Sequence, residues 1–360
     1  MAKCKICGDP IKRCSRRKTN NWCHTWKHHH FPKPDYKTHH FSFIFILLII
    51  IILYVMISVI EVTPIQTSIS PTPIETKVST IVITPIQTPI SPIPTSTPTP
   101  TPFIEKYNTN PKMVNYNYNL QGTKGQIPYT VYGGINDYLK SQPRGISYYQ
   151  GESPPTDIDY IIKHLDNKEQ KEFIDPLIYK IQNITSNKDD QARIAISFVQ
   201  NINYDWQGFE TGILTSKYPY EVLYTNSGVC GEKTELLAYM LREIGYEVAI
   251  FRFDIESHDA IGIKCPQQYS YRNSGYCFVE STLPSIITDS GANYIGVGQL
   301  KSEPKILEIS DGSSFDSVSE EYNDAVTLNK IYKMGSVLDE NNYNKWSSLV
   351  NKYGIKTSEK

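Results

Sequence analysis

The sequence predicts an α+β domain that is preceded by one transmembrane helix and a stalk rich in proline and threonine. Three observations lead to this expectation. An uncharged apolar run lies near the N-terminus, a segment dominated by Pro, Thr and Ser follows it, and helical periodicity then gives way to a series of strand-like segments. Helices followed by consecutive strands are typical of the α+β class. The 360 residues include 39% hydrophobic and 20% charged ones, which is ordinary for a globular protein.

Residues 1–40 form a cationic segment rich in Cys and His. Its Lys and Arg residues far outnumber its acidic residues, Asp9 and Asp35. The pair "CKIC" has the spacing of a zinc knuckle, and the segment faintly resembles an AN1-type zinc finger whose second half is degenerate. Two interpretations remain open. The segment either holds a small structural zinc site or is a cationic tail that fixes membrane topology. The candidate zinc ligands are Cys4, Cys7, Cys14 and Cys23.

Residues 41–60, "FSFIFILLIIIILYVMISVI", carry no charged side chain. About twenty apolar residues are the length that an α-helix needs to cross a bilayer. A signal peptide has a shorter apolar region that ends in small residues at a cleavage site, and "VIEVTP" offers no such site. Because Lys and Arg gather before this run, the positive-inside rule predicts a cytoplasmic N-terminus and an extracytoplasmic domain at the cell membrane. The bilayer is therefore an expected partner, whereas the net charge of −1 argues against nucleic acid.

Residues 61–103 repeat Thr, Pro, Ser and Ile, as in "PTSTPTPTP". Proline removes backbone donors and holds φ, so this linker is expected to be extended and to lack a core. Aromatic and aliphatic residues return from position 104. We divide the globular part into an N-terminal extension (104–188), a catalytic core (189–300) and a C-terminal extension (301–360). In the first of these, "PPTDIDYIIKHLDNKEQKEFIDPLIYKIQNI" predicts two helices divided near Pro176.

The stretch "NSGVCGEKTELLAYMLREIGYEV" places Cys230 where a turn becomes a helix. Apolar residues at helical spacing predict a helix that begins at Cys230 and ends at Gly245. The free N–H groups and the positive dipole at a helix start favour a thiolate there and can stabilise an oxyanion. An isolated free cysteine, however, is more often a small buried apolar residue. Cys230 needs suitable partners before it is interpreted as a nucleophile.

His258 and Glu280 are the expected partners. His258 opens the strand-like segment "SHDAIGIKC" and can act as the general base, whereas His164 lies on a predicted helix and is interpreted as a surface or packing residue. Glu280 lies among apolar residues in "CFVEST", where a carboxylate needs a partner. If the two strands pair with His258 opposite Glu280, the carboxylate orients the imidazole. The sequence therefore predicts a catalytic triad of Cys230, His258 and Glu280.

These motifs, from "QARIAISFVQNINYD" to "YCFVEST", resemble the transglutaminase-like superfamily, whose papain-like core uses Cys, His and Asp or Glu in this order. The resemblance covers about residues 189–282 and places the glycine of the nucleophile motif on Gly228. One microbial branch often has an acidic residue after the cysteine, where this chain has Gly231. For the oxyanion, the backbone N–H of Cys230 is the preferred donor, with the side chains of Gln207, Tyr218 and Tyr220 as further candidates. Trp206 either borders the cleft or lies in the core, and the core is the preferred interpretation.

The resemblance implies that Cys230 attacks a carboxamide or peptide carbonyl and forms a thioester. Transfer of the acyl group to water would make the protein a peptidase or amidase, and transfer to an amine would make a cross-link. The expected substrate is a protein or peptide at the cell surface, and catalysis is expected to need no cofactor. The alternative is a catalytically inactive binding module that is displayed on the stalk.

Cys265 and Cys277 bracket a loop between two predicted strands. Outside the cell a disulfide there is an option. However, the register with His258 opposite Glu280 places Cys265 opposite Asn273. That geometry disfavours a bridge.

Overall fold

The computed structural model describes residues 102–211, 216–292, 294, 297–335 and 337–356. In this part the chain is a mixed α+β domain, as predicted. The prediction of a transmembrane helix is corrected here, because no helix among the described residues is long and apolar enough to span a bilayer. Residues 41–60, on which that prediction was made, lie outside them, as do the linker and the candidate zinc ligands Cys4, Cys7, Cys14 and Cys23.

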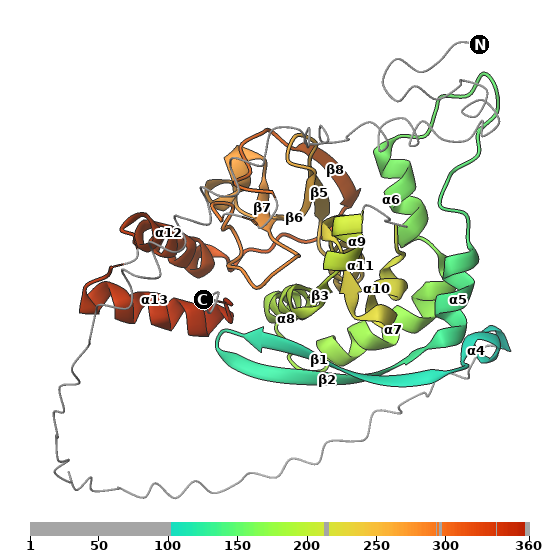
Figure 1. Cartoon of the computed structure of the whole chain (residues 1–360), viewed down its shortest axis with the longest axis horizontal. Coiled ribbons are helices and arrows are strands. Elements are labelled where there is room, and N and C mark those ends of the chain that lie inside the picture. Colours follow the sequence, from blue (N-terminus) through green and yellow to red (C-terminus); the bar gives the residue numbers. More distant parts are fainter. Residues whose placement is uncertain (1–101, 212–215, 293, 295–296, 336, 357–360) are drawn as a thin grey trace, which may run out of the picture. The chain divides into compact units, whose positions relative to one another are not determined.

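Helices and one long hairpin build the first half of the domain (Figure 1). The hairpin turns at Gln121 and Gly122, which both have positive φ (49° and 92°), and it packs against α8 and α7. The elements of this half are α4 (Pro102–Tyr107), β1 (Pro111–Leu120), β2 (Thr123–Tyr132), α5 (Gly133–Ser141), α6 (Asp157–Leu165), α7 (Lys168–Gln182) and α8 (Lys188–Asn201).

The boundary between α6 and α7 differs from the predicted one. Pro176 lies inside α7, and the chain breaks earlier, at Asn167, whose side chain accepts a hydrogen bond from the Gln170 N–H (3.0 Å). An interior proline costs a helix about 3 kcal/mol. Phe173 and Leu177 on the same helix are buried, and each such side chain contributes about 1.5–3 kcal/mol. Burial of several apolar residues therefore outweighs the proline.

The central helix α11 (Cys230–Ile244) begins and ends where the sequence predicts, with Gly245 at its C-terminus in the left-handed region (φ 98°). Leu236, Leu237 and Tyr239 have no exposed surface, so α11 is enclosed on several sides, as expected of a core helix. Short elements lead into it. They are β3 (Asn203–Tyr204), α9 (Trp206–Thr211), α10 (Pro219–Thr225) and β4 (Ser227–Gly228).

A four-stranded antiparallel sheet, in the order β7-β6-β5-β8, lies beside α11 (Figure 1). Three of its strands are the predicted ones, and the fourth comes from the segment beyond residue 300. A hydrophobic cluster that includes Phe251 and Phe278 packs on this sheet. The strands are β5 (Val248–Phe253), β6 (His258–Lys264), β7 (Tyr276–Val279) and β8 (Lys305–Ser310), with the 3₁₀ turns η1 (Gln267–Tyr269) and η2 (Tyr271–Asn273) between β6 and β7.

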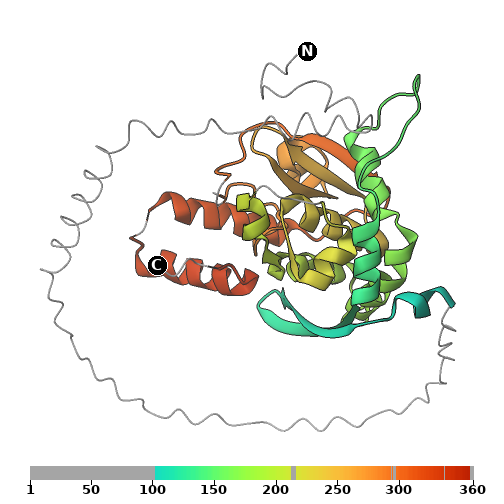
Figure 2. The same ribbon diagram turned by 45° about the vertical axis from the view of Figure 1, so that its right-hand side comes forward.

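Two further helices, α12 (Ser319–Lys333) and α13 (Glu340–Tyr353), lie side by side in both views (Figures 1 and 2). Lys352 joins them by ion pairs with Glu320 and Asp324 (both 2.7 Å). Leu328 and Leu349 are buried in a small separate core.

Cys265 and Cys277 form a disulfide, contrary to the expectation from the predicted register. The β6–β7 ladder pairs Ile263 with Cys277, and the Cys265 N–H donates to the Gly275 carbonyl (3.1 Å). The real register is thus two residues away from the predicted one. It makes the two cysteines diagonal neighbours, with Cα atoms 5.7 Å apart, which is within the normal range for a bridge.

Candidate active site

Two short parallel strands position the start of α11. Tyr204 on β3 pairs with Gly228 on β4, and the Asp205 N–H donates to the Gly228 carbonyl (3.1 Å). This pairing brings Tyr204 next to the cysteine two residues after Gly228. A Cβ atom on Gly228 would lie only 3.2 Å from the side chains of Lys233 and Val222, so the close packing at this point explains the glycine of the nucleophile motif.

Glu232 caps α11 from within its first turn. Its Oε2 accepts the Val229 N–H and its Oε1 accepts the Lys217 N–H (both 3.1 Å). Burial raises the pKa of Glu232, and the nearby Lys217 and the two N–H groups partly offset this rise. The carboxylate thereby fixes the turn that precedes Cys230 and stabilises the helix start.

Cys230 is the free cysteine of the described part of the chain. Its Sγ lies 3.9 Å from the Ser257 carbonyl oxygen in the turn that leads into β6. Its backbone N–H lies close enough to the Tyr204 hydroxyl to favour the ionised form of that group and so lower its pKa, against the larger effect of burial, which raises it. The thiol therefore lies at the N-terminus of α11, between the β3 segment and the turn before His258.

His258 and Glu280 form a buried pair. His258 Nε2 lies 2.9 Å from Glu280 Oε2, and the residues are 4% and 0% exposed. The other carboxylate oxygen, Oε1, accepts the N–H and hydroxyl of Thr282 (2.7 and 2.6 Å). Every Glu280 oxygen thus has a donor, which is the condition under which a carboxylate remains ionised inside a protein.

The electrostatics of this pair favour an imidazolium and a carboxylate. Burial lowers the pKa of His258, but the charge of Glu280 and hydrogen bonds with Cys230 and Glu280 raise it to about 10. Burial raises the pKa of Glu280, but His258 and Thr282 lower it below its ordinary value. At neutral pH the ring therefore carries a proton that it can donate.

The structure brings all three predicted residues together. The imidazole contacts the carboxylate through Nε2, and the thiol faces the carbonyl of Ser257, the residue directly before His258, close enough to raise the His258 pKa. Because Nε2 is engaged by Glu280, Nδ1 is the nitrogen left to face Cys230. The Tyr294 ring stacks on the imidazole, with centroids 5.1 Å apart and an interplanar angle of 25°, and so restrains its plane. His164, in contrast, is buried on α6, where its Nδ1 contacts Glu235 on α11 (2.9 Å).

Tyr204 is the site residue that the sequence did not predict. Its hydroxyl lies next to the Cys230 N–H, and burial together with the charge of Cys230 raises its pKa. The proposed alternatives lie elsewhere. Gln207 is exposed, Tyr218 packs on His164, and the Tyr220 hydroxyl accepts the Tyr132 N–H (2.6 Å). The pairing of Tyr204 with Gly228, which joins segments distant in sequence, is the signal that the sequence alone did not supply.

The prediction that Trp206 lies in the core is wrong. Its side chain is 44% exposed, and its ring packs on Tyr204 (centroids 4.7 Å apart) and Phe209 (6.2 Å). Trp206 follows β3 directly and lies on the short helix α9. It therefore borders the segment that carries Tyr204.

The absence of an acidic residue after Cys230 has a local cause. A Cβ atom on Gly231 would lie 3.2 Å from Oδ2 of Asp259, and Asp259 is held by two hydrogen bonds from Arg252 (3.1 and 3.0 Å). An acidic side chain at position 231 would meet this carboxylate. In this chain the carboxylate beside the cysteine is supplied by the residue next to His258.

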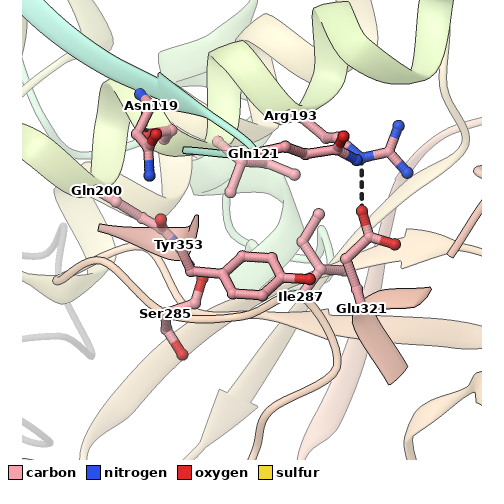
Figure 3. A pocket seen from close by; sticks show the side chains of 10 residues that line it. Asn119, Gln121, Arg193, Gln200, Ser285, Ile287, Glu321 and Tyr353 are labelled. Carbon is pink, nitrogen blue, oxygen red and sulfur yellow. Dashed lines mark hydrogen bonds and ion pairs between the residues drawn. The ribbon is translucent and has the colours of Figure 1, made fainter. Parts of the chain in front are cut away.

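A small hollow among the described residues lies away from the thiol and the imidazole. It is lined from α8, the end of β1 and the turn after it, the loop after β7, α12 and α13, and Arg193 and Glu321 form an ion pair at one side of it (Figure 3). Gln200 connects it to the candidate site, because its Nε2 donates to the backbone carbonyls of Glu280 (2.9 Å) and Ser285 (3.2 Å). No group of three or more His, Cys, Asp and Glu residues in the described part of the chain is placed to hold a metal ion.

The chain matches no protein-family model and no curated protein. Among solved structures it is similar to the crystal structure of a protein from Parabacteroides distasonis that is described as a putative protease. The two are 14% identical, with a TM-score of 0.28, and the match covers 58% of this chain and 40% of that one. The chain thus spans less than half the length of this neighbour, and a likeness of this size says nothing about its own activity.

Proposed function

We propose that the domain is a transglutaminase-like cysteine enzyme that acts on amide or peptide bonds through a thioester. One observation carries the proposal. A buried His258–Glu280 pair contacts a free thiol at the N-terminus of a helix, and the His258 pKa is raised to about 10. A purely structural cysteine has no need of a buried ion pair, which is costly to desolvate. The arrangement supports a thiolate–imidazolium pair.

The proposed reaction begins when the Cys230 thiolate attacks the carbonyl carbon of an amide. A C–S bond forms, and the carbonyl oxygen becomes an oxyanion that can accept hydrogen bonds from the Cys230 N–H and the Tyr204 hydroxyl. These two groups contact one another in the resting site, so the oxyanion would take the place of Tyr204 as acceptor of the Cys230 N–H. His258 then donates its proton to the leaving nitrogen, the C–N bond breaks, and a thioester remains.

The second half returns the enzyme to its starting state. His258 takes a proton from the acceptor, which attacks the thioester carbon, and the C–S bond breaks to regenerate the thiolate. Water as the acceptor gives hydrolysis, and an amine gives acyl transfer. Glu280 stays ionised throughout and stabilises the imidazolium. The chemistry uses only side chains and backbone of this chain. The Cys265–Cys277 disulfide supports an extracytoplasmic location, because such bonds persist in oxidising compartments.

Alkylation across pH tests this proposal. The full chain is treated with iodoacetamide between pH 5 and 9, and label is counted by mass on the tryptic peptide that ends at Lys233, which holds Cys230. We expect rapid labelling of Cys230 near pH 6, a pH at which an unperturbed thiol hardly reacts. The Cys230→Ala variant should not take up this label. Incubation with peptides and an amine probe then separates hydrolysis from transfer. Labelling that begins only above about pH 8, as in an ordinary thiol, would favour the inactive binding module.

A further inference from the structure

Lys233 lies on α11, one turn after Cys230, and has no exposed surface. Lysine is almost never fully buried without a partner, since its ammonium is strongly hydrated in water. Its aliphatic stem passes Gly228 closely, as described above. The side chain therefore crosses beneath the nucleophile motif to reach the interior behind the candidate site.

Backbone carbonyl groups surround the Lys233 ammonium. Its Nζ donates to the carbonyl oxygens of Ile202 (2.7 Å) and Thr282 (2.8 Å), and a third, that of Gln200, lies 3.5 Å away. Three donors on one ammonium thus meet three acceptors. These acceptors come from two segments that are distant in sequence, the end of α8 and the loop after β7.

Both segments carry groups of the candidate site. Ile202 directly precedes β3, which holds Tyr204. Thr282 donates its N–H and hydroxyl to Glu280, and its carbonyl accepts from Lys233. Burial lowers the Lys233 pKa to about 7, and the charge of Glu280 lies close enough to offset part of this fall. The Lys233 side chain therefore connects two backbone segments, one that carries Tyr204 and one that carries Glu280, to the helix that begins at Cys230.

We propose that Lys233 is a positioning residue of this site, which holds Tyr204 and Glu280 in place relative to Cys230. This inference rests on the function proposed above. A role in stability alone does not account for the residue, because an apolar side chain of similar length costs less to bury than an ammonium. The ammonium adds directional hydrogen bonds, which hold two backbone segments at a fixed distance from α11 in a way that apolar contacts do not.

Lys233→Met in the full chain tests the proposal, with Leu237→Ala as the control. Leu237 is fully buried on the same helix and its apolar side chain makes no hydrogen bond, so its truncation destabilises the fold without removing a hydrogen bond to either backbone segment. We expect Lys233→Met to lower kcat by about a hundredfold with KM within about twofold, because small misplacement of reacting groups has effects of that size. We also expect it to lose the rapid labelling of Cys230 near pH 6. Leu237→Ala should lower Tm but keep both properties.

Each outcome decides a separate point. If wild-type Cys230 shows no rapid labelling near pH 6, the proposed function itself fails. If the wild type shows it and folded Lys233→Met keeps both this labelling and its kcat, only the role of Lys233 is overturned. Lys233→Gln, whose amide can still donate two hydrogen bonds, should recover part of the activity. If both variants fail to fold, Lys233 serves the fold as a whole and the positioning role is also overturned.

Discussion

His258 and Glu280 share a hydrogen bond of 2.9 Å although the strands that carry them place the two residues two positions out of register. The ladder pairs Ile261 with Val279, so His258 would stand opposite Thr282 if it continued. His258 and Glu280 still lie on the same face, because positions that differ by two share a face of a strand. The offset leaves Thr282 free to donate to Glu280.

Glu280→Gln should lower kcat by about 10²–10⁴-fold, since the imidazolium loses its anionic partner. Initial rates on a peptide or amine-transfer substrate measure this. Asp289→Asn is the matched control, because Asp289 is also buried, in the loop that follows, but it contacts Asn329 (2.8 Å) and Gly291 rather than His258. Equal losses in both variants would contradict the assignment of Glu280.

The His258–Glu280 pair should make stability depend on pH in a defined direction. The pKa of His258 is raised from 6.5 to about 10, so its contribution is full below pH 6.5 and is lost as pH rises through about 10. The pKa of Glu280 is lowered from 4.5, so its contribution is present above pH 4.5 and is lost at lower pH. Urea unfolding across this range should show the largest difference between wild type and His258→Asn near pH 5–6. A difference that grows toward pH 10 would contradict this.

Tyr204→Phe should separate acyl chemistry from thiol reactivity. Removal of an oxyanion donor costs about 10²–10³ in kcat, and we expect a loss of this order on amide substrates. Alkylation of Cys230 by iodoacetamide forms no oxyanion, so its rate near pH 6 should stay within about twofold of wild type. Tyr220→Phe removes a hydroxyl that bonds to the Tyr132 N–H and should leave kcat unchanged. If alkylation and turnover fall together in Tyr204→Phe, the hydroxyl acts on the thiol instead.

Removal of the disulfide should lower stability more than activity. Cys265 and Cys277 are 12 residues apart, and a bridge over a loop of that size contributes about 3 kcal/mol to the free energy of unfolding. Thermal unfolding of the double variant Cys265→Ala with Cys277→Ala, compared with the oxidised wild type that keeps the disulfide, measures this contribution. An unchanged Tm would show that the hairpin is held by its other contacts.

The local sequence signals were sufficient for part of the site. Apolar spacing and Gly245 predicted both ends of the helix of Cys230, and the alternation of strand residues placed His258 and Glu280 on one face. Relations between distant segments were not predictable in this way. The two-residue shift in register brought Cys265 and Cys277 within reach of a disulfide. The pairing of Tyr204 with Gly228 placed Tyr204 beside Cys230. Packing of α7 against the core outweighed the helix break expected at Pro176.

Lys233 shows the same limit in another form. Its sequence neighbours are typical of an exposed or half-exposed helix position, yet its side chain is fully buried. Only the meeting of the segments that end at Ile202 and begin after Glu280 creates acceptors for its ammonium. A single sequence shows that a lysine is present, but it does not show that three backbone carbonyl oxygens lie where they can accept hydrogen bonds from its buried ammonium.

The close approach of Asp259 to Gly231 means that substitutions at these two positions are expected to depend on one another. Any side chain at position 231 would press on the Asp259 carboxylate, whose Oδ2 lies 3.2 Å from the site of the missing Cβ, and would disturb its pairing with Arg252. A relative that gains an acidic residue after the nucleophile is therefore expected to have replaced the aspartate that follows its histidine. The replacement of Asp259 is expected to come first, because a lineage that gained the acidic residue at position 231 while it kept Asp259 would have passed through a strained intermediate.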